Sequence, residues 1–238
     1  MDPSSRLLSP RRGPGAQMIR AVIFDRDGTL LDFSGMFLAF VDDLHVRQGL
    51  SVPSDRDHVL SLDYWHSIEK GRTIGDILVM DHLDGIPRSY MEEAQLFPGT
   101  SDVIRTLSNG GMRLAIASAW VATDQTKCLL RREQVADCFE SVLTRDDLGA
   151  EAIAGTPSSL EVKLALVQRS LKELEMDPRE VAIVGDAPID IQAGKALAMR
   201  TIAVRTGNFR FLGHHLEALA PDHVVASVAE LSASEHLT

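Results

Sequence analysis

The sequence predicts an α/β protein in which helices cover both faces of a parallel sheet, with a small helical segment inserted after the first strand. Three observations carry this prediction. Short continuous apolar runs alternate with helical patterns from residue 98 onward, which is typical of strands buried on both faces. An earlier apolar run, Ile19–Ile23, is followed closely by two carboxylates. Residues 33–97, which lie between, show apolar residues at helical spacing and no strand pattern.

The first predicted strand leads into a pair of acids. Ile19–Ile23 is apolar and rich in β-branched residues, and Asp25 and Asp27 follow it, one residue apart. Neighbouring carboxylates repel each other and are costly to bury without a cation. Gly28 lets the backbone turn sharply and approach a ligand, and Thr29 adds a hydroxyl and a backbone N–H. This composition indicates a site for a metal ion and a phosphate group.

Residues 33–97, which we call the cap, differ in pattern from the rest of the chain. The spacing of apolar residues predicts helices over 34–46, over 64–83 in two pieces, and over 89–96. The cap is therefore expected to be a small, mostly helical insertion.

The remaining chain alternates between strands and helices. Apolar runs predict strands over 113–117, 139–143, 181–184, 201–204 and 223–225. Helical patterns between them predict helices over 102–109, 124–132, 162–175 and 189–197. In a parallel sheet of this kind, ligands bind at the carboxyl ends of the strands.

Further polar residues follow these strands where they end. Ser118 follows one strand, and Asp186 and Asp190 follow another. With the two acids after the first strand, four carboxylates and one hydroxyl are expected at the same edge of the sheet. A hard, oxygen-seeking cation such as Mg²⁺ is the natural occupant of such a site.

These motifs resemble those of the haloacid dehalogenase-like (HAD) hydrolase superfamily, and most closely those of phosphoglycolate-phosphatase-like enzymes with a helical cap. The similarity rests on DRDGTL at 25–30, on GDAPIDIQAGKA at 185–196 and on Ser118. It implies a Rossmann-like, three-layer core with a parallel sheet. The expected division of the chain is a disordered tail (1–17), a HAD-like core (18–32 and 98–238) and the cap (33–97).

The resemblance also implies roles for the acids. Asp25 would attack phosphorus and form an aspartyl phosphate, and Asp27 would protonate the leaving alkoxide and then activate water. A Mg²⁺ cofactor would be held by Asp25, the backbone carbonyl of Asp27, Asp186 and Asp190. Such an ion offsets the repulsion between an ionised carboxylate nucleophile and a dianionic substrate. The phosphoryl oxygens would be bound by Thr29, Ser118 and the backbone N–H of Ala119.

The family's third motif supplies a lysine, and here the chain departs from the pattern. Phosphatases of this kind usually carry Gly-Lys-Pro, whereas this chain has Thr156 in the lysine's place. Lys163, at the start of a predicted helix, is the expected catalytic substitute, with Lys195 and Lys127 as alternatives.

Other residues near the motifs also have expected positions. Arg26 would face away from the two acids if strand alternation continues, in a solvated or fold-stabilising role. Trp120 either lines the mouth of the pocket or packs against the fold. Trp65 and Tyr64 are expected in the core of the cap.

The predicted function is that of a Mg²⁺-dependent phosphatase for a small phosphorylated metabolite, such as phosphoglycolate or a sugar phosphate, with the cap closing over the site. A dehalogenase has no need of Asp27. A phosphonate-cleaving relative would carry Ala at that position and a Schiff-base lysine in the cap, where Lys70 is the single lysine. A phosphomutase keeps both acids and stays an alternative, as does a non-catalytic binding module.

Composition limits the partners of the chain. Its formal net charge of −10 argues against binding to nucleic acid or to an anionic membrane. Cys128 and Cys138 are expected to be reduced thiols. No apolar run approaches the roughly 18 residues needed to span a bilayer, so a cytoplasmic location is expected. A monomer and a homodimer are equally compatible with the sequence.

Overall fold

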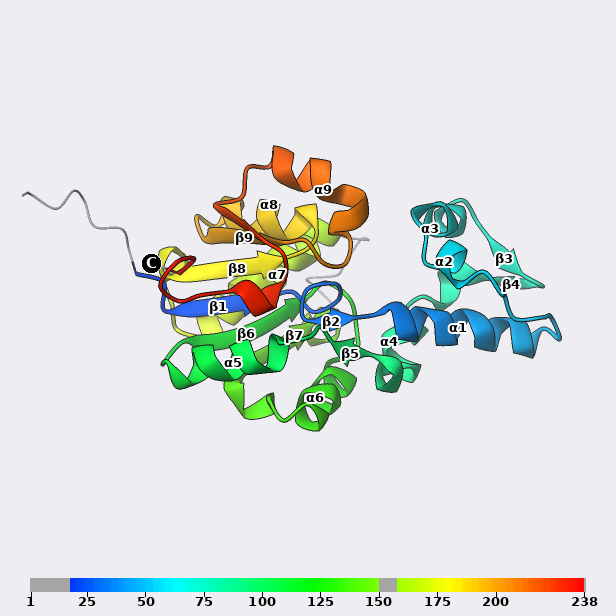
Figure 1. The fold of residues 1–238 in the computed structure, drawn as a ribbon, viewed down its shortest axis with the longest axis horizontal. Coiled ribbons are helices and arrows are strands. Elements are labelled where there is room, and N and C mark those ends of the chain that lie inside the picture. Colours follow the sequence, from blue (N-terminus) through cyan, green and yellow to red (C-terminus); the bar gives the residue numbers. More distant parts are fainter. Residues whose placement is uncertain (1–17, 150–157, 238) are drawn as a thin grey trace, which may run out of the picture.

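A six-stranded sheet forms the centre of the molecule (Figure 1). Its strands lie in the order β10-β9-β8-β1-β6-β7, and each neighbouring pair is parallel. The strands are β1 (Ala21–Phe24), β6 (Arg113–Ser118), β7 (Phe139–Thr144), β8 (Val181–Gly185), β9 (Arg200–Val204) and β10 (His223–Val225). The predicted α/β class with a parallel sheet is confirmed.

The computed structural model describes residues 18–149 and 158–237. The expected tail over 1–17 and Thr156 lie outside these ranges. No described helix is long and apolar enough to cross a membrane. Cys128 and Cys138 are both free.

The sheet is apolar on both faces because helices cover both. Along β1, Ala21 and Ile23 belong to one buried cluster, with residues of α7 (Ser159–Glu173) and α8 (Pro188–Ala196). Val22 and Phe24 belong to another, with residues of α5 (Thr100–Asn109). This alternation follows from the two-residue repeat of a strand. The covering helices are α5 (Thr100–Asn109), α6 (Thr123–Arg132), α7 (Ser159–Glu173), α8 (Pro188–Ala196) and α9 (Phe209–Ala218).

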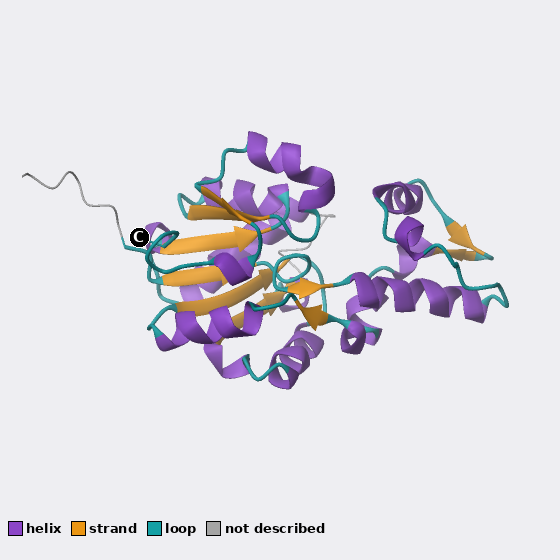
Figure 2. Cartoon of the chain, in the orientation of Figure 1, coloured by secondary structure: helices purple, strands orange, loops and turns teal. Residues whose placement is uncertain are grey.

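The cap projects from the edge of the sheet where the strands end, as Figures 1 and 2 show. Its helices are α1 (Ser34–Arg47), α2 (Arg56–Val59), α3 (Leu62–Glu69) and α4 (Gly85–Ser89). They share a hydrophobic cluster that includes Phe37, Phe40 and Tyr64. The two connections into the cap, β2 (Leu31–Asp32) and β5 (Gln95–Leu96), pair as an antiparallel ribbon.

The cap differs from the prediction in two places. A short hairpin, β3 (Thr73–Ile74) with β4 (Ile77–Leu78), stands where the second part of a helix was expected. The predicted helix over 89–96 is instead the end of α4, a 3₁₀ turn (Met91–Glu93) and β5. Outside the cap, α9 was not predicted.

Candidate active site

The backbone leaves β1 at Asp25 and turns back at Gly28. Gly28 has φ +81°, and a Cβ there would lie 2.2 Å from Asp186 Oδ2. Only glycine therefore lets the two loops approach so closely. Since β1 and β8 are neighbours in the sheet, Asp25 and Asp186, which follow these strands, lie side by side.

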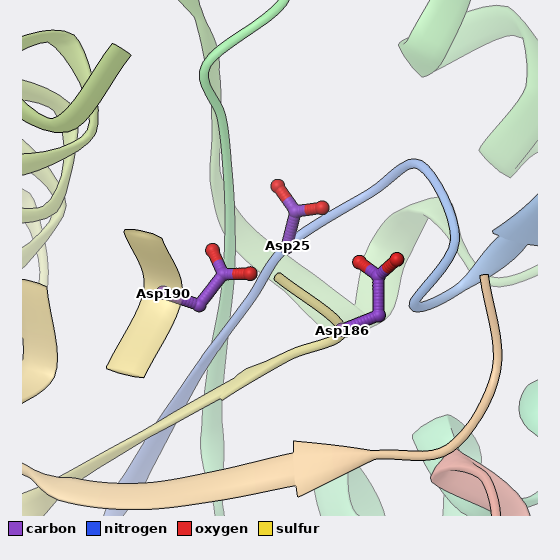
Figure 3. Close-up of side chains that lie close together, drawn as sticks. All are labelled: Asp25, Asp186 and Asp190. Carbon is purple, nitrogen blue, oxygen red and sulfur yellow. The ribbon is translucent and has the colours of Figure 1, made fainter. Parts of the chain in front are cut away.

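Three carboxylates converge at this edge of the sheet. Asp25 follows β1, Asp186 follows β8, and Asp190 lies in the first turn of α8 (Figure 3). One oxygen from each lies within 4.8 Å of the others. Asp186 and Asp190 are fully buried, whereas 13% of the Asp25 side chain is exposed.

Burial and mutual repulsion raise the pKa values of this cluster. Burial raises the pKa of Asp186 well above its ordinary value, and the charges of Asp25 and Asp190 add to the effect. Burial likewise raises the pKa of Asp190 to about 6, although Lys163 opposes the shift. Three carboxylates in this environment favour a nearby positive charge.

Lys163 supplies one positive charge from α7. The helix begins with a capping box between Ser158 and Glu161, which fixes the turn from which Lys163 projects. Its Nζ lies 2.6 Å from Asp25 Oδ1 and 2.7 Å from Asp190 Oδ1. Burial alone would lower the pKa of Lys163, but the two carboxylates raise it above its ordinary value, so the group is charged.

Lys163 also donates to the backbone carbonyl of Ala117 at 2.7 Å and is 1% exposed. The ammonium group is therefore fixed by three oxygens. The alternative lysines, Lys195 and Lys127, are exposed.

The residues present fit a divalent cation. The donor set consists of carboxylate oxygens, which is the set that Mg²⁺ prefers. Asp186 is held by a bond to each oxygen: Thr29 Oγ1 donates to Oδ1 at 3.0 Å and the Asn208 backbone N–H donates to Oδ2 at 2.6 Å. Asp190 Oδ1 is buried and accepts no hydrogen bond of good geometry from the described residues, although it faces Lys163.

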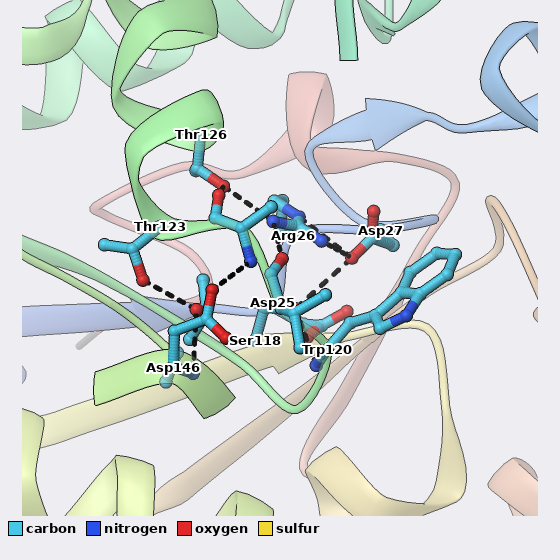
Figure 4. Close-up of polar contacts among 12 residues, drawn as sticks. Asp25, Arg26, Asp27, Ser118, Trp120, Thr123, Thr126 and Asp146 are labelled. Atoms are coloured by element: carbon cyan, nitrogen blue, oxygen red, sulfur yellow. Dashed lines mark hydrogen bonds and ion pairs between the residues drawn. The ribbon is translucent and has the colours of Figure 1, made fainter. Parts of the chain in front are cut away.

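The carboxylate of Asp27 does not belong to this group of three. It contacts Arg26 and Ser118 (Figure 4). Arg26 Nε and Nη2 lie 2.9 and 2.8 Å from Asp27 Oδ2, and Ser118 Oγ donates to the same oxygen at 3.2 Å. Burial raises the pKa of Asp27, while Arg26 opposes the shift. Asp27 Oδ1 has no hydrogen-bond partner among the described residues.

The expectation for Arg26 was wrong in its orientation. Its side chain is 1% exposed and turns toward Asp27. Strand alternation does not continue past Phe24, because the chain leaves the sheet there. Arg26 Nη1 also donates to the Val121 carbonyl at 2.9 Å and to Thr126 Oγ1 at 2.6 Å, which ties the first loop to the start of α6.

The predicted phosphate-binding residues occupy different positions. The hydroxyl of Thr29 is buried and directed to Asp186. Ser118 Oγ donates to Asp27 and accepts from the Trp120 backbone N–H at 3.2 Å. Ala119 lines the cavity described next.

A cavity of about 790 Å³ opens between the cap and the sheet edge. Asp27, Gly28 and Ala119 line it next to the carboxylate cluster. Trp120 and Trp65 line it as well, although Trp65 also packs on Phe37 with ring centroids 5.7 Å apart.

The segment Thr206–Asn208 was missed from the sequence. Thr206 Oγ1 donates to the Gly28 carbonyl at 2.6 Å, and Gly207 has φ +53° and abuts Gly28 and Asp186. This segment follows β9, which was predicted over 201–204. Polar residues after other strand ends were selected as site candidates, and the same criterion at this strand would have included Thr206.

Comparison with known proteins gives a consistent result. The family model described as "Haloacid dehalogenase-like hydrolase" matches residues 22–204. A phosphoglycolate phosphatase of Synechococcus elongatus is 26% identical over 90% of this chain and 95% of its own length. The pyrophosphatase PpaX of Oceanobacillus iheyensis is 22% identical over the same shares. A solved haloacid dehalogenase-like hydrolase from Bacteroides fragilis shares the fold, with a TM-score of 0.67 at 20% identity, over 90% of this chain and 100% of that one.

Proposed function

This chain belongs to the haloacid dehalogenase-like hydrolase family and is a hydrolase of its phosphatase type, and we propose that it releases phosphate from a small phosphorylated metabolite with Asp25 as the nucleophile. The observation that carries the proposal is the convergence of Asp25, Asp186 and Asp190 around Lys163. We propose the division into tail, core and cap, and a cytoplasmic location, on the sequence grounds given above.

The first step is transfer of the phosphoryl group to Asp25. An oxygen of its carboxylate attacks phosphorus, and the bond between phosphorus and the ester oxygen breaks. Lys163 holds Oδ1 of the nucleophile. Asp27, whose raised pKa favours the protonated form, gives its proton to the leaving alkoxide.

The second step is hydrolysis of the aspartyl phosphate. Water attacks phosphorus, Asp27 takes up its proton, and the bond between phosphorus and Asp25 breaks to release inorganic phosphate. Arg26 and Ser118 keep Asp27 in place by holding Oδ2, which leaves Oδ1 for proton exchange. Asp25, the backbone carbonyl of Asp27, Asp186 and Asp190 would hold Mg²⁺, which would supply positive charge that offsets repulsion between the nucleophile and the phosphoryl oxygens.

The test is hydrolysis of p-nitrophenyl phosphate with Mg²⁺ and with EDTA, by the wild-type protein and by Asp25→Asn. We expect release of inorganic phosphate that requires the metal and is abolished by the substitution. Asp124→Asn, which alters an exposed carboxylate on α6, is the matched control and should keep full activity. Activity of Asp25→Asn equal to that of the control would refute the proposal, and transfer of the phosphoryl group to an added sugar instead of to water would identify a mutase.

A further inference from the structure

Building on the phosphatase function proposed above, we propose that the substrate is the phosphate ester of a bulky, ring-bearing alcohol that carries no further negative charge. The cavity between the cap and the sheet edge carries this inference through its size, its lining and its charge.

The size of the cavity exceeds what a small acid needs. Its volume is about 790 Å³, within the range of roughly 300–1,000 Å³ in which proteins bind ligands of many atoms. A phosphoryl group esterified to a two-carbon acid would leave most of this space to water. The cavity therefore fits a leaving group with a larger body.

The lining of the cavity is aromatic on both sides. Phe33, Phe37 and Trp65 line it from the cap, and Trp120 and Phe211 line it from the core. Trp65, Trp120 and Phe211 are each only partly buried, so part of each ring is open to an occupant. Aromatic rings that line a cavity favour a planar or apolar group within it.

The charges on the wall disfavour an anionic leaving group. Beyond the catalytic acid, Asp32, Asp81 and Asp84 line the cavity, and all three are exposed. Among the described residues that line it, the cations are Arg145 and Arg210.

The two cations have partners of different kinds. Arg145 pairs with Asp84. Arg210 donates to the Leu60 carbonyl at 3.0 Å and lies over the ring of Phe211, 4.4 Å from its centroid. The Arg145–Asp84 pair offsets its own charges, so Asp32 and Asp81 outnumber the remaining cation, Arg210. A carboxylate or second phosphate on the substrate would add negative charge to this acidic lining, and like charges placed together reduce affinity.

The test compares benzyl phosphate with 4-carboxybenzyl phosphate, which differ in one charge on the ring. Binding is measured in Asp25→Asn with Mg²⁺ through tryptophan fluorescence, because the chain has two tryptophans and both line this cavity. We expect saturable binding of benzyl phosphate about tenfold tighter than that of the carboxylate, given the like charges on the wall. In the wild type, kcat/KM should follow the same order, with phosphoglycolate and pyrophosphate below benzyl phosphate.

Two variants test the effect of the acids that line the cavity. Asp81→Lys should remove most of the discrimination against 4-carboxybenzyl phosphate, whereas Asp76→Lys, an exposed acid of the cap that does not line the cavity, should leave it unchanged. Equal or tighter binding of the carboxylate, or no saturable fluorescence change with either compound, would overturn the inference. If p-nitrophenyl phosphate is still hydrolysed in an Asp25-dependent manner in that case, the proposed function stands and the inference on the substrate alone fails.

Discussion

Lys163→Met removes the buried positive charge that lies between two carboxylates and keeps most of the length of the side chain. The lost contacts are those of Nζ with Asp25 at 2.6 Å, with Asp190 at 2.7 Å and with the Ala117 carbonyl at 2.7 Å. Removing one partner of a buried ion pair typically costs 3–5 kcal/mol because the other charge is left uncompensated, and we expect about 3 kcal/mol here. The lower end applies because Asp190, whose pKa is about 6, can take up a proton when the ammonium is absent.

Mg²⁺ should reduce this loss of stability. Removal of the ammonium eliminates a positive charge beside the proposed metal site, so the variant should bind Mg²⁺ more tightly than the wild type and gain more stability from it. A bound ligand stabilises the folded state by about 2.7 kcal/mol at 100 times its dissociation constant. The value of kcat should nevertheless fall by about 100-fold or more, because Lys163 no longer holds the nucleophile Asp25 in place.

The assay is urea unfolding followed by circular dichroism, in EDTA and in Mg²⁺, together with kcat for p-nitrophenyl phosphate. Lys195→Met is the matched control, since Lys195 is exposed on α8, and it should change the free energy of unfolding by less than about 0.5 kcal/mol. If Lys163→Met behaves like this control in both stability and kcat, the electrostatic reasoning about the cluster is refuted.

Two further predictions concern the surroundings of the site, and a third concerns His223 at the start of β10. Asp27→Asn and Arg26→Lys should slow hydrolysis of an alkyl phosphate more than that of p-nitrophenyl phosphate, because a good leaving group needs less protonation. Equal slowing of both substrates would contradict the role of Asp27. Gly207→Ala would place a Cβ 2.3 Å from Asp186 Oδ2 at a φ of +53°. The substitution should cost at least about 1 kcal/mol of stability and weaken Mg²⁺ binding measured by calorimetry. Unchanged Mg²⁺ affinity would count against the metal site. Partial burial, aided by nearby positive charge, lowers the pKa of His223. The free energy of unfolding should therefore fall as pH drops below about 6.5, and His223→Gln should flatten that dependence. An unaltered pH profile in the variant would show that His223 does not contribute.

The carboxylate site was largely predictable because its geometry follows from the sheet. Parallel strands present their carboxyl ends at one edge of the sheet. Because β1 and β8 are neighbours, the acids that follow them necessarily lie close together. The position of Lys163 was reached differently, through resemblance to the family, and the structure supplies its contacts with Asp25 and Asp190.

The surroundings of the site were less predictable, for physical reasons. The orientation of Arg26 depends on the exact residue at which the chain leaves the sheet, and a shift of one position reverses the face. The hairpin of β3 and β4 has two residues in each strand, too few to show a period of two. The lining of the cavity joins Trp65 with Trp120, a proximity that depends on how the cap packs and that no local pattern encodes.

The most direct test of the central claim is chemical trapping of the phosphorylated nucleophile. The protein is mixed with substrate and Mg²⁺, quenched, and treated with borohydride, which reduces an acyl phosphate to an alcohol. Mass spectrometry of the digested protein should then find homoserine at position 25, only after turnover and in no other aspartate. Homoserine at another aspartate, or an unmodified position 25 during steady turnover, would contradict the claim that Asp25 carries the phosphoryl group.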